Sequence, residues 1–234
     1  MGSNGTVCAL VALVAATMLA IAGCTCPLAK KAATTPGKQP GRAVNEVVLP
    51  GPNASMTLTE GNFVMNWLVL GPFKFGEGDF GGEQQQAATD KEFMPDEAAL
   101  DGTQKAPEGT ACKENLFKGD AKPGQVNLDA FYGTIDHAAA YAVCWLDCPA
   151  DIPDAGLCIG SDDYVKVWIN GKLVHTYKEV RRASDWDQDK VAGIKLNKGL
   201  NRVVVKCVDV VLDWDFYFRL TDKNGLPMTV KAGK

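Results

Sequence analysis

The stretch GSDDYVKVWINGKLVHTY, residues 160–177, decides the fold class of this chain. Apolar side chains recur at every second position from Val165 to Ile169, which is the period of a strand with one face buried. Asn170-Gly171 then separates this run from a second alternating run. Asn-Gly between two such runs indicates a β-hairpin, because a type I′ turn requires positive φ angles at both central positions. The stretch therefore predicts antiparallel strands at 164–169 and 172–177.

Short apolar or alternating runs recur along the chain, separated by turn residues, and each predicts a further strand. They cover residues 63–70, 139–146, 157–159, 191–196, 201–211 and 215–220. Helical periodicity is weak, with one short helix expected at 95–100. Many short strands with turn signals predict an all-β fold, an antiparallel β-sandwich of the jelly-roll kind. Residues from about 74 to 125 do not follow strand spacing, and we expect a long irregular insertion there, after the first core strand.

The chain has 234 residues, which suits one domain with tails and excludes a multi-domain enzyme or a polytopic membrane protein. No acidic residue precedes Glu46, whereas four of the 24 basic residues do. The part from Glu46 onward is therefore clearly acidic and repels phosphate backbones. We expect no nucleic-acid partner.

The N-terminal segment predicts export. Residues 7–23 carry no charge, and the run is barely long enough to cross a bilayer but has the length of a signal-peptide core. We therefore expect a signal peptide at 1–23, a polar tether at 24–45 and a β-sandwich domain at 46–234, with its core at about 60–222.

The run ends in Ile21-Ala22-Gly23-Cys24, which resembles a bacterial lipoprotein lipobox. The resemblance implies lipidation of Cys24 and cleavage after Gly23. The alternative is an uncleaved anchor in which Cys24 is a buried or free thiol. Either way we expect the domain outside the cytoplasm, attached to the cell membrane or the outer membrane.

Six further cysteines follow Cys24 in the sequence. This even number permits disulfides in an oxidising compartment. Their spacing matches no zinc signature and predicts no particular pairing. They are Cys26, Cys112, Cys144, Cys148, Cys158 and Cys207.

Several motifs occur in a characteristic order: 66–73, 129–133, 141–143, 160–174, 196–202 and 216–220. This order resembles galactose-binding-like and PA14-like jelly-roll modules, which are common in secreted proteins of planctomycete-type bacteria. The resemblance covers about residues 60–222. It implies an eight-stranded β-sandwich and glycan binding, although no residue matches a known sugar site.

Asp162 and Asp163 are adjacent carboxylates in a turn that leads into a strand. Two carboxylates with nearby carbonyl groups suit Ca²⁺, which takes six to eight oxygen ligands. Alternatively, these side chains only bond to their own backbone, as Ser and Asp do in tight corners. A second, weaker metal candidate is the alternating Asp185, Asp187 and Asp189. No other cofactor is expected.

Two tryptophans, Trp186 and Trp214, are each flanked by aspartates on both sides. A flat ring beside hydrogen-bonding groups suits the apolar face of a sugar, so we expect at least one ring to be exposed. The alternative is that both rings pack in the core. The predicted ligand-binding residues are Trp186, Trp214, Arg181, Arg182, Asp185 and Asp187.

Catalytic motifs are missing from the sequence: there is no Gly-x-Ser-x-Gly elbow, HExxH or phosphate-binding glycine loop. We therefore expect a non-catalytic cell-envelope lipoprotein whose jelly roll binds carbohydrate or a neighbouring envelope component. The alternative is a structural or protein-interaction module of the envelope with no sugar site.

Overall fold

The computed structural model describes residues 47–49, 61–76, 82–104, 113–115, 122–228 and 230–232. The chain divides into two compact units, residues 1–40 and 41–234, and every described residue belongs to the second. The predicted lipidation residue Cys24, together with Cys26 and Cys112, lies outside the described residues.

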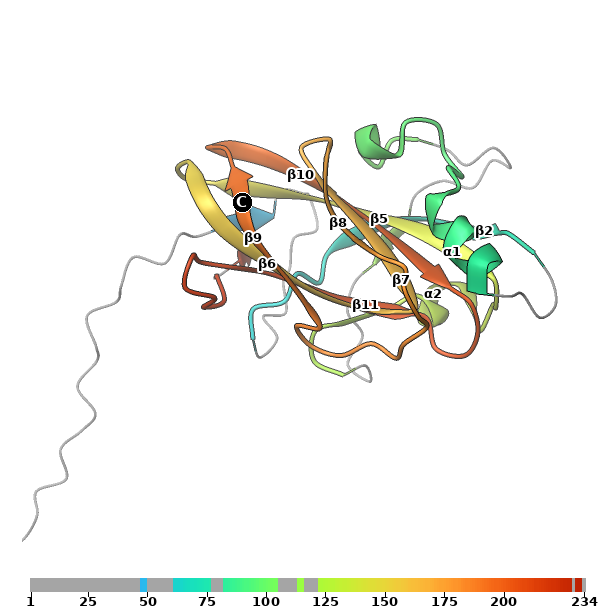
Figure 1. Cartoon of the computed structure of the whole chain (residues 1–234). Coiled ribbons are helices and arrows are strands. Elements are labelled where there is room, and N and C mark those ends of the chain that lie inside the picture. Colours follow the sequence, from blue (N-terminus) through green and yellow to red (C-terminus); the bar gives the residue numbers. More distant parts are fainter. Residues whose placement is uncertain are drawn as a thin grey trace, which may run out of the picture. The chain divides into compact units, whose positions relative to one another are not determined.

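Two β-sheets build the domain, which confirms the predicted all-β sandwich. The larger sheet contains β1 (Val47–Leu49), β2 (Trp67–Lys74), β3 (Lys113–Asn115), β5 (Ala138–Cys148), β7 (Tyr164–Ile169), β8 (Lys172–Tyr177), β10 (Gly199–Asp209) and β12 (Val230–Ala232). The smaller sheet contains β4 (Gln125–Asn127), β6 (Ile152–Asp162), β9 (Asp189–Leu196) and β11 (Asp215–Thr221). Figure 1 shows the two layers.

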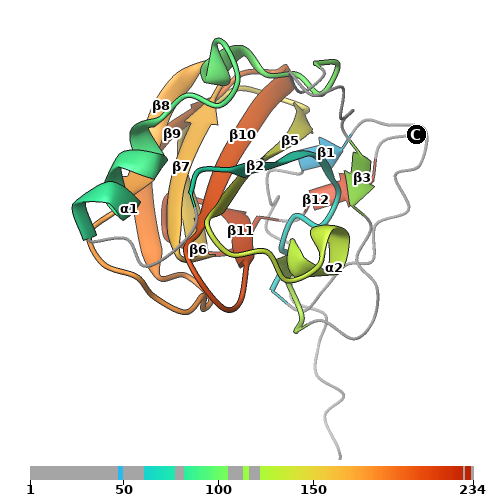
Figure 2. The same ribbon diagram turned by 90° about the vertical axis from the view of Figure 1, so that its right-hand side faces the viewer.

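The strand order of the larger sheet is β12-β1-β5-β10-β7-β8, with β2 also pairing with β5 and with β3. The order of the smaller sheet is β4-β11-β6-β9. The described pairings are antiparallel except for β1 with β12, which is parallel. Figure 2 shows β8, β7, β10, β5 and β2 as neighbours in one curved layer.

The core lies between the two sheets and follows the period-two pattern of the strands. In β10, Val203, Val205 and Cys207 face inward, while Lys206 between them faces the other side. Trp67 of β2 packs edge-on against the rings of Phe216 and Phe218 from β11, each at a centroid distance of 5.3 Å. The buried aromatic surface thus joins the two sheets.

The insertion after β2 contains more regular structure than the sequence predicts. Residues 82–90 form the helix α1 (Gly82–Asp90), and the short helix expected at 95–100 is the 3-10 turn η1 (Glu97–Ala99). Beyond the insertion, α2 (Asp129–Tyr132) forms one further helical turn. The sequence of α1, GEQQQAATD, carries no apolar stripe and so gives no helix signal. Among the described residues, no helix is long and apolar enough to cross a membrane.

A buried lysine holds this insertion on the outer face of the larger sheet. Lys206 is fully buried, and its Nζ donates to the carbonyl oxygen of Thr89 at 3.0 Å and to Oε1 of Glu97 at 2.7 Å. Arg202 adds hydrogen bonds to two carbonyl oxygens of η1. Because α1 has little apolar surface, polar contacts hold it on the sheet, from Lys206 of β10 to Thr89 and from Lys166 of β7 to Asp90 at 2.7 Å.

The hairpin between β7 and β8 has the predicted turn, with φ of 52° at Asn170 and 81° at Gly171. Gly171→Val should lower the free energy of unfolding by more than about 1 kcal/mol, because a β-branched residue resists a positive φ. Gly82→Val is the control, since a Cβ there meets no atom within 4 Å and no positive φ is required. Denaturant melts of both variants test this, and equal losses would contradict the turn assignment.

Candidate cation site at one end of the sandwich

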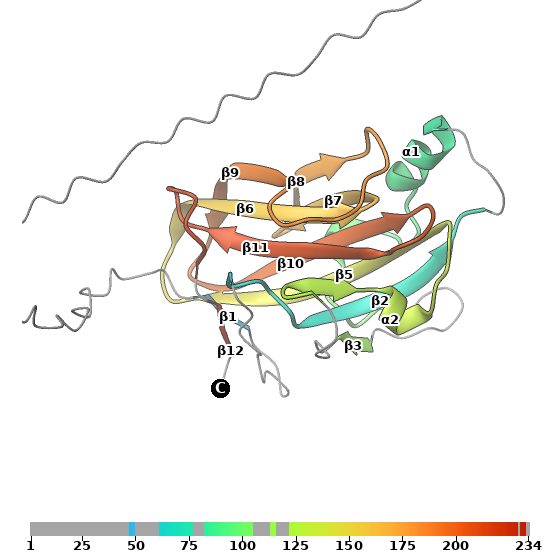
Figure 3. The same cartoon turned by 90° about the horizontal axis from the view of Figure 1, so that it is seen from below.

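The corner between β6 and β7 brings carboxylates from both sheets together. β6 of the smaller sheet ends at Asp162 and β7 of the larger sheet begins at Tyr164, so the chain crosses between the sheets at Asp163. Val208 pairs with Tyr164, which places Asp209, the last residue of β10, beside this crossing. The backbone N–H of Asp163 donates to the carbonyl oxygen of Val208 at 3.1 Å. Figure 3 shows β6, β7 and β10 converging toward the end of the sandwich near α1 and α2.

Asp162, Asp163 and Asp209 form a compact acidic cluster. One oxygen from each carboxylate lies within 4.8 Å of the other two, and the residues are only 7%, 3% and 0% exposed. Asp163 accepts hydrogen bonds from the backbone N–H groups of Arg182, at 3.2 Å, and Val210, at 2.9 Å. Both carboxylate oxygens of Asp209 are buried without a hydrogen-bond partner in the described part of the chain. A buried carboxylate in this state needs a proton or a cation.

The electrostatics of the cluster reflect this burial. Burial removes the carboxylate of Asp209 from water, and the nearby charge of Asp163 adds to the effect. Together they raise the pKa of Asp209 to about 9. Burial and the charges of Asp163 and Asp215 raise the pKa of Asp162 to about 8. Burial also raises the pKa of Asp163, against the hydrogen bond from Val210. In the absence of a cation, the cluster therefore retains protons at neutral pH.

The donor set fits a hard divalent cation. Ca²⁺ is bound by carboxylate and carbonyl oxygens and by water, and three carboxylates within reach of one point supply half of a six-oxygen shell. The free oxygens of Asp209 are the observation that distinguishes this cluster from a turn stabilised by its own backbone. Asp162 and Asp163 are the pair singled out in the sequence. Asp209 is not apparent there, because it only ends an apolar strand.

The predicted aromatic residues do not share one site. Trp186 is 39% exposed, donates from Nε1 to the carbonyl oxygen of Pro123 and packs 5.0 Å from the ring of Phe63. The expectation that at least one ring is exposed is thus confirmed. Trp214 is 0% exposed and stacks on Tyr132, so its interpretation as an accessible loop aromatic is wrong. It immediately precedes β11, and its flanking aspartates differ: Asp213 is exposed, whereas Asp215 is buried and accepts hydrogen bonds from Gln125 and Ser184.

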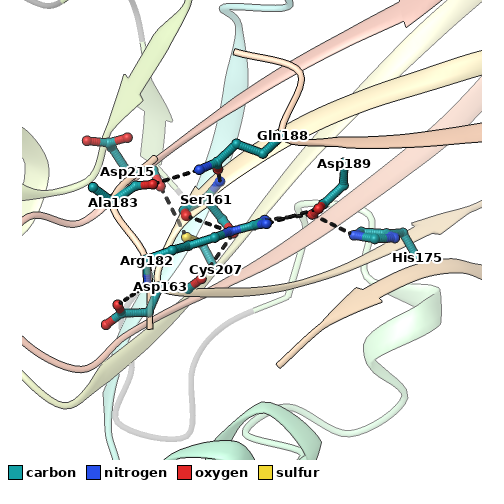
Figure 4. A network of polar contacts seen from close by, with 9 residues as sticks. All are labelled: Ser161, Asp163, His175, Arg182, Ala183, Gln188, Asp189, Cys207 and Asp215. Atoms are coloured by element: carbon teal, nitrogen blue, oxygen red, sulfur yellow. Dashed lines mark hydrogen bonds and ion pairs between the residues drawn. The ribbon is translucent and has the colours of Figure 1, made fainter. Parts of the chain in front are cut away.

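The predicted charged residues divide between exposed and half-buried positions. Arg182 is bound on several sides, and its guanidinium contacts Asp189 and Ser161 and lies 3.5 Å from the centre of the Tyr177 ring. Asp187 pairs with Arg219. Arg181 and Asp185 are exposed. Of the predicted ligand residues, only Arg182 contacts the acidic cluster, through its backbone N–H (Figure 4).

The described residues also show the state of four of the cysteines and of the second metal candidate. Cys144, Cys148, Cys158 and Cys207 are free thiols and buried. The alternating aspartates at 185–189 do not form a metal cluster there, because Asp187 and Asp189 point to different arginines.

No family model and no curated protein matches the chain. Solved structures that resemble it include the PA14 domain of the antifreeze protein MpAFP, at 14% identity and a TM-score of 0.27, covering 41% of this chain and 54% of that one. Another is a GH31 alpha-xylosidase from Xanthomonas citri, at 14% identity and a TM-score of 0.29, covering 51% of this chain and 15% of that one. The chain thus spans only part of either structure. Both likenesses are weak, and neither assigns a ligand to this protein.

The two tryptophans should respond differently to truncation. Trp214→Ala removes a fully buried ring and should cost about 3–5 kcal/mol of stability. Trp186→Ala removes a half-exposed ring and should cost clearly less. Chemical denaturation of both variants measures this, and a larger loss for Trp186→Ala would contradict the assignment of core and surface.

The acidic cluster should make stability depend on pH in a defined direction. An unfolded aspartate titrates near pH 4, whereas Asp209 titrates at about 9 in the folded protein, so between these values the folded state binds the extra proton. Stability from this group is therefore lost as pH rises through the window. In EDTA, Asp209→Asn should melt higher than wild type at pH 8, where the unfolded carboxyl is ionised but the folded one must retain a proton. At pH 5, close to the pKa of the unfolded carboxyl, the two proteins should melt at more similar temperatures. Thermal melts at both pH values decide this, and no difference at pH 8 would show that the pKa of Asp209 is not raised in the folded protein.

Proposed function

We propose that this protein is a non-catalytic binding module in which the Asp162–Asp163–Asp209 cluster holds a divalent cation, Ca²⁺ first, and presents it to a carbohydrate. The single observation that carries the proposal is the fully buried Asp209, whose two carboxylate oxygens have no partner among the described residues although two other carboxylates lie beside it. Buried charges in proteins are paired or coordinate metals.

The chemistry of such a site suits neutral hydroxyl ligands. Three carboxylates overcompensate a divalent charge, so a further anionic ligand gains little, while Ca²⁺ retains coordination positions for neutral oxygens. Adjacent hydroxyl groups of a sugar are neutral oxygen ligands of that kind. Asp162 is the most exposed of the three residues and provides the side from which a ligand would approach.

The loops around the cluster offer apolar contacts as well. Asp163 is bound by Val210 and Arg182, and each of these has an exposed aliphatic residue two positions away, Leu212 and Val180. Exposed aliphatic side chains in the loops that hold Asp163 would offer apolar contacts to the C–H faces of a sugar ring. This arrangement supports the carbohydrate as the ligand class.

A structural role of the cation is the second candidate function, and the burial of the cluster favours it. With all three residues less than a tenth exposed, a cation with water or carbonyl oxygens in its remaining positions would be closed to ligands. The module would then act in the envelope through contacts with other proteins.

The proposal includes the address expected from the sequence. A signal peptide at 1–23 and lipidation at Cys24 would place the domain outside the cytoplasm on a membrane. This part of the proposal rests on the sequence alone.

A glycan array and calorimetry with the soluble domain test the function. Asp154→Asn changes an exposed aspartate elsewhere on β6 and is the control. Wild type and this variant should bind glycan in the presence of Ca²⁺ and release the glycan in EDTA. Asp209→Asn should bind neither Ca²⁺ nor glycan. Ca²⁺ binding without glycan binding would favour the structural role, and no Ca²⁺ binding by wild type would overturn the cation site.

A further inference from the structure

We infer that Arg182 is a positioning residue, which aims Asp163 into the cation cluster and connects that cluster to the contact between β8 and β9. The inference rests on the proposed function, because it concerns the affinity of the same cluster for its cation. It goes further in assigning a role to the loop between β8 and β9.

The direct contact is made by the backbone of Arg182. Its N–H donates to Oδ1 of Asp163, while Oδ2 of Asp163 accepts from the N–H of Val210. The orientation of Asp163 therefore depends on two loops, one before β9 and one before β11. Only a loop held in place can supply such a donor at a fixed position.

The side chain of Arg182 provides that hold. Nη1 and Nη2 donate to the two carboxylate oxygens of Asp189, at 2.9 and 2.6 Å, and the guanidinium also reaches the carbonyl and hydroxyl oxygens of Ser161. A two-pronged contact between Arg and Asp fixes direction as well as distance. Figure 4 shows the guanidinium lying between Ser161 on one side and Asp189 on the other.

Asp189 connects this arginine to the other sheet. It is the first residue of β9, at the edge of the smaller sheet, and its Oδ2 lies 2.9 Å from Nε2 of His175 in β8, at the edge of the larger sheet. Burial raises the pKa of Asp189, but hydrogen bonds from Arg182 and His175 outweigh it, and the pKa lies well below its usual range. Asp189 is therefore a stable anion that holds both partners.

The rest of the loop packs tightly on the strand that leads to the cluster. Gln188 accepts from the N–H of Ser161 and donates to the carbonyl oxygen of Ala183, as Figure 4 also shows. At Gly160, a Cβ atom would lie 1.8 Å from the carbonyl oxygen of Asp185, so the loop backbone rests directly on β6. The loop is therefore in direct contact with the residues before Asp162.

The sequence supplies a matched control within the same loop. Asp187 forms a two-pronged pair with Arg219, with side chains 19% and 13% exposed, compared with 16% and 14% for Asp189 and Arg182. The pair of Asp187 has no contact with the acidic cluster among the described residues. The two pairs thus resemble each other in chemistry and burial, but only the pair of Asp189 also contacts His175 and the loop position that binds Asp163.

The experiment compares Asp189→Asn with Asp187→Asn by calorimetric titration with Ca²⁺ alone. Asp189→Asn should weaken Ca²⁺ binding about tenfold, as supporting residues behind metal ligands do, whereas Asp187→Asn should leave the affinity within about twofold of wild type. Melting temperatures in EDTA should fall in both variants, which separates positioning from a general loss of stability.

Hydrogen exchange provides a second measurement, which would not change with Ca²⁺ in this way if Asp189 only stabilised the fold. Coupling between two sites is reciprocal, so Ca²⁺ should slow amide exchange in residues 178–188 of wild type and of Asp187→Asn, and do so much less in Asp189→Asn. If Asp189→Asn does not fold, Arg182→Lys takes its place, since it retains the charge and the backbone N–H but not the two-pronged contact.

The outcomes separate the two hypotheses. Ca²⁺ binding by wild type with equal affinities in the two variants would overturn the positioning role and leave the cation site standing. Failure of wild type to bind Ca²⁺ would overturn both. Weakened binding in Asp189→Asn alone, with loss of Ca²⁺-dependent protection in the loop, is the result we expect.

Discussion

The carboxylate of Asp209 imposes the constraint around which this end of the sandwich is organised. Its strand, β10, runs through the middle of the larger sheet and is apolar on its inner face, so the chain carries a charge to the edge of the core. Burying an ionised group without a partner costs several kcal/mol, and a protein avoids that cost by holding a proton or a cation there. Asp162 and Asp163 increase the effect, because each raises the pKa of Asp209 further.

The opposite face of the same strand shows how the protein treats a buried charge that needs no ligand. Lys206 is as deeply buried as Asp209, yet its ammonium group has an anion, Glu97, and two carbonyl oxygens as partners. Tyr141 donates to the same Glu97, which completes the set. The two buried groups, three residues apart on β10, therefore differ in their partners: the lysine is satisfied within the chain, and the aspartate has no partner among the described residues.

Much of the fold follows from local sequence, because each strand shows its own period and each turn its own residues. The hairpin at Asn170-Gly171 is a clear example, since the turn requires φ angles that few residue types adopt. The helix α1 could not be predicted, because its sequence carries no apolar stripe and its partners, such as Lys166 and Lys206, lie far away in the chain.

The site is less predictable than the fold, and the reason is topological. Asp162 and Asp163 stand together in the sequence, but Asp209 joins them only because β10 pairs with β7. Trp186 and Trp214 have the same neighbouring residues in the sequence but opposite environments, because one lies in a loop and the other immediately precedes a strand. The sequence around Gly160 likewise does not indicate that the loop backbone at Asp185 lies against it.

A cation at this corner would also change how the domain is held together. Asp162 belongs to the smaller sheet and Asp209 to the larger one, so one ion would join the two sheets beside the point where the chain crosses between them. The four described cysteines are free thiols, and disulfides between them do not serve that purpose. Because the three carboxylates meet only in the folded chain, the free energy of cation binding would add to the stability of the fold. Recognition and stability would then depend on the same ion, and the loop anchored by Arg182 would be ordered under the same conditions in which the ligand is bound.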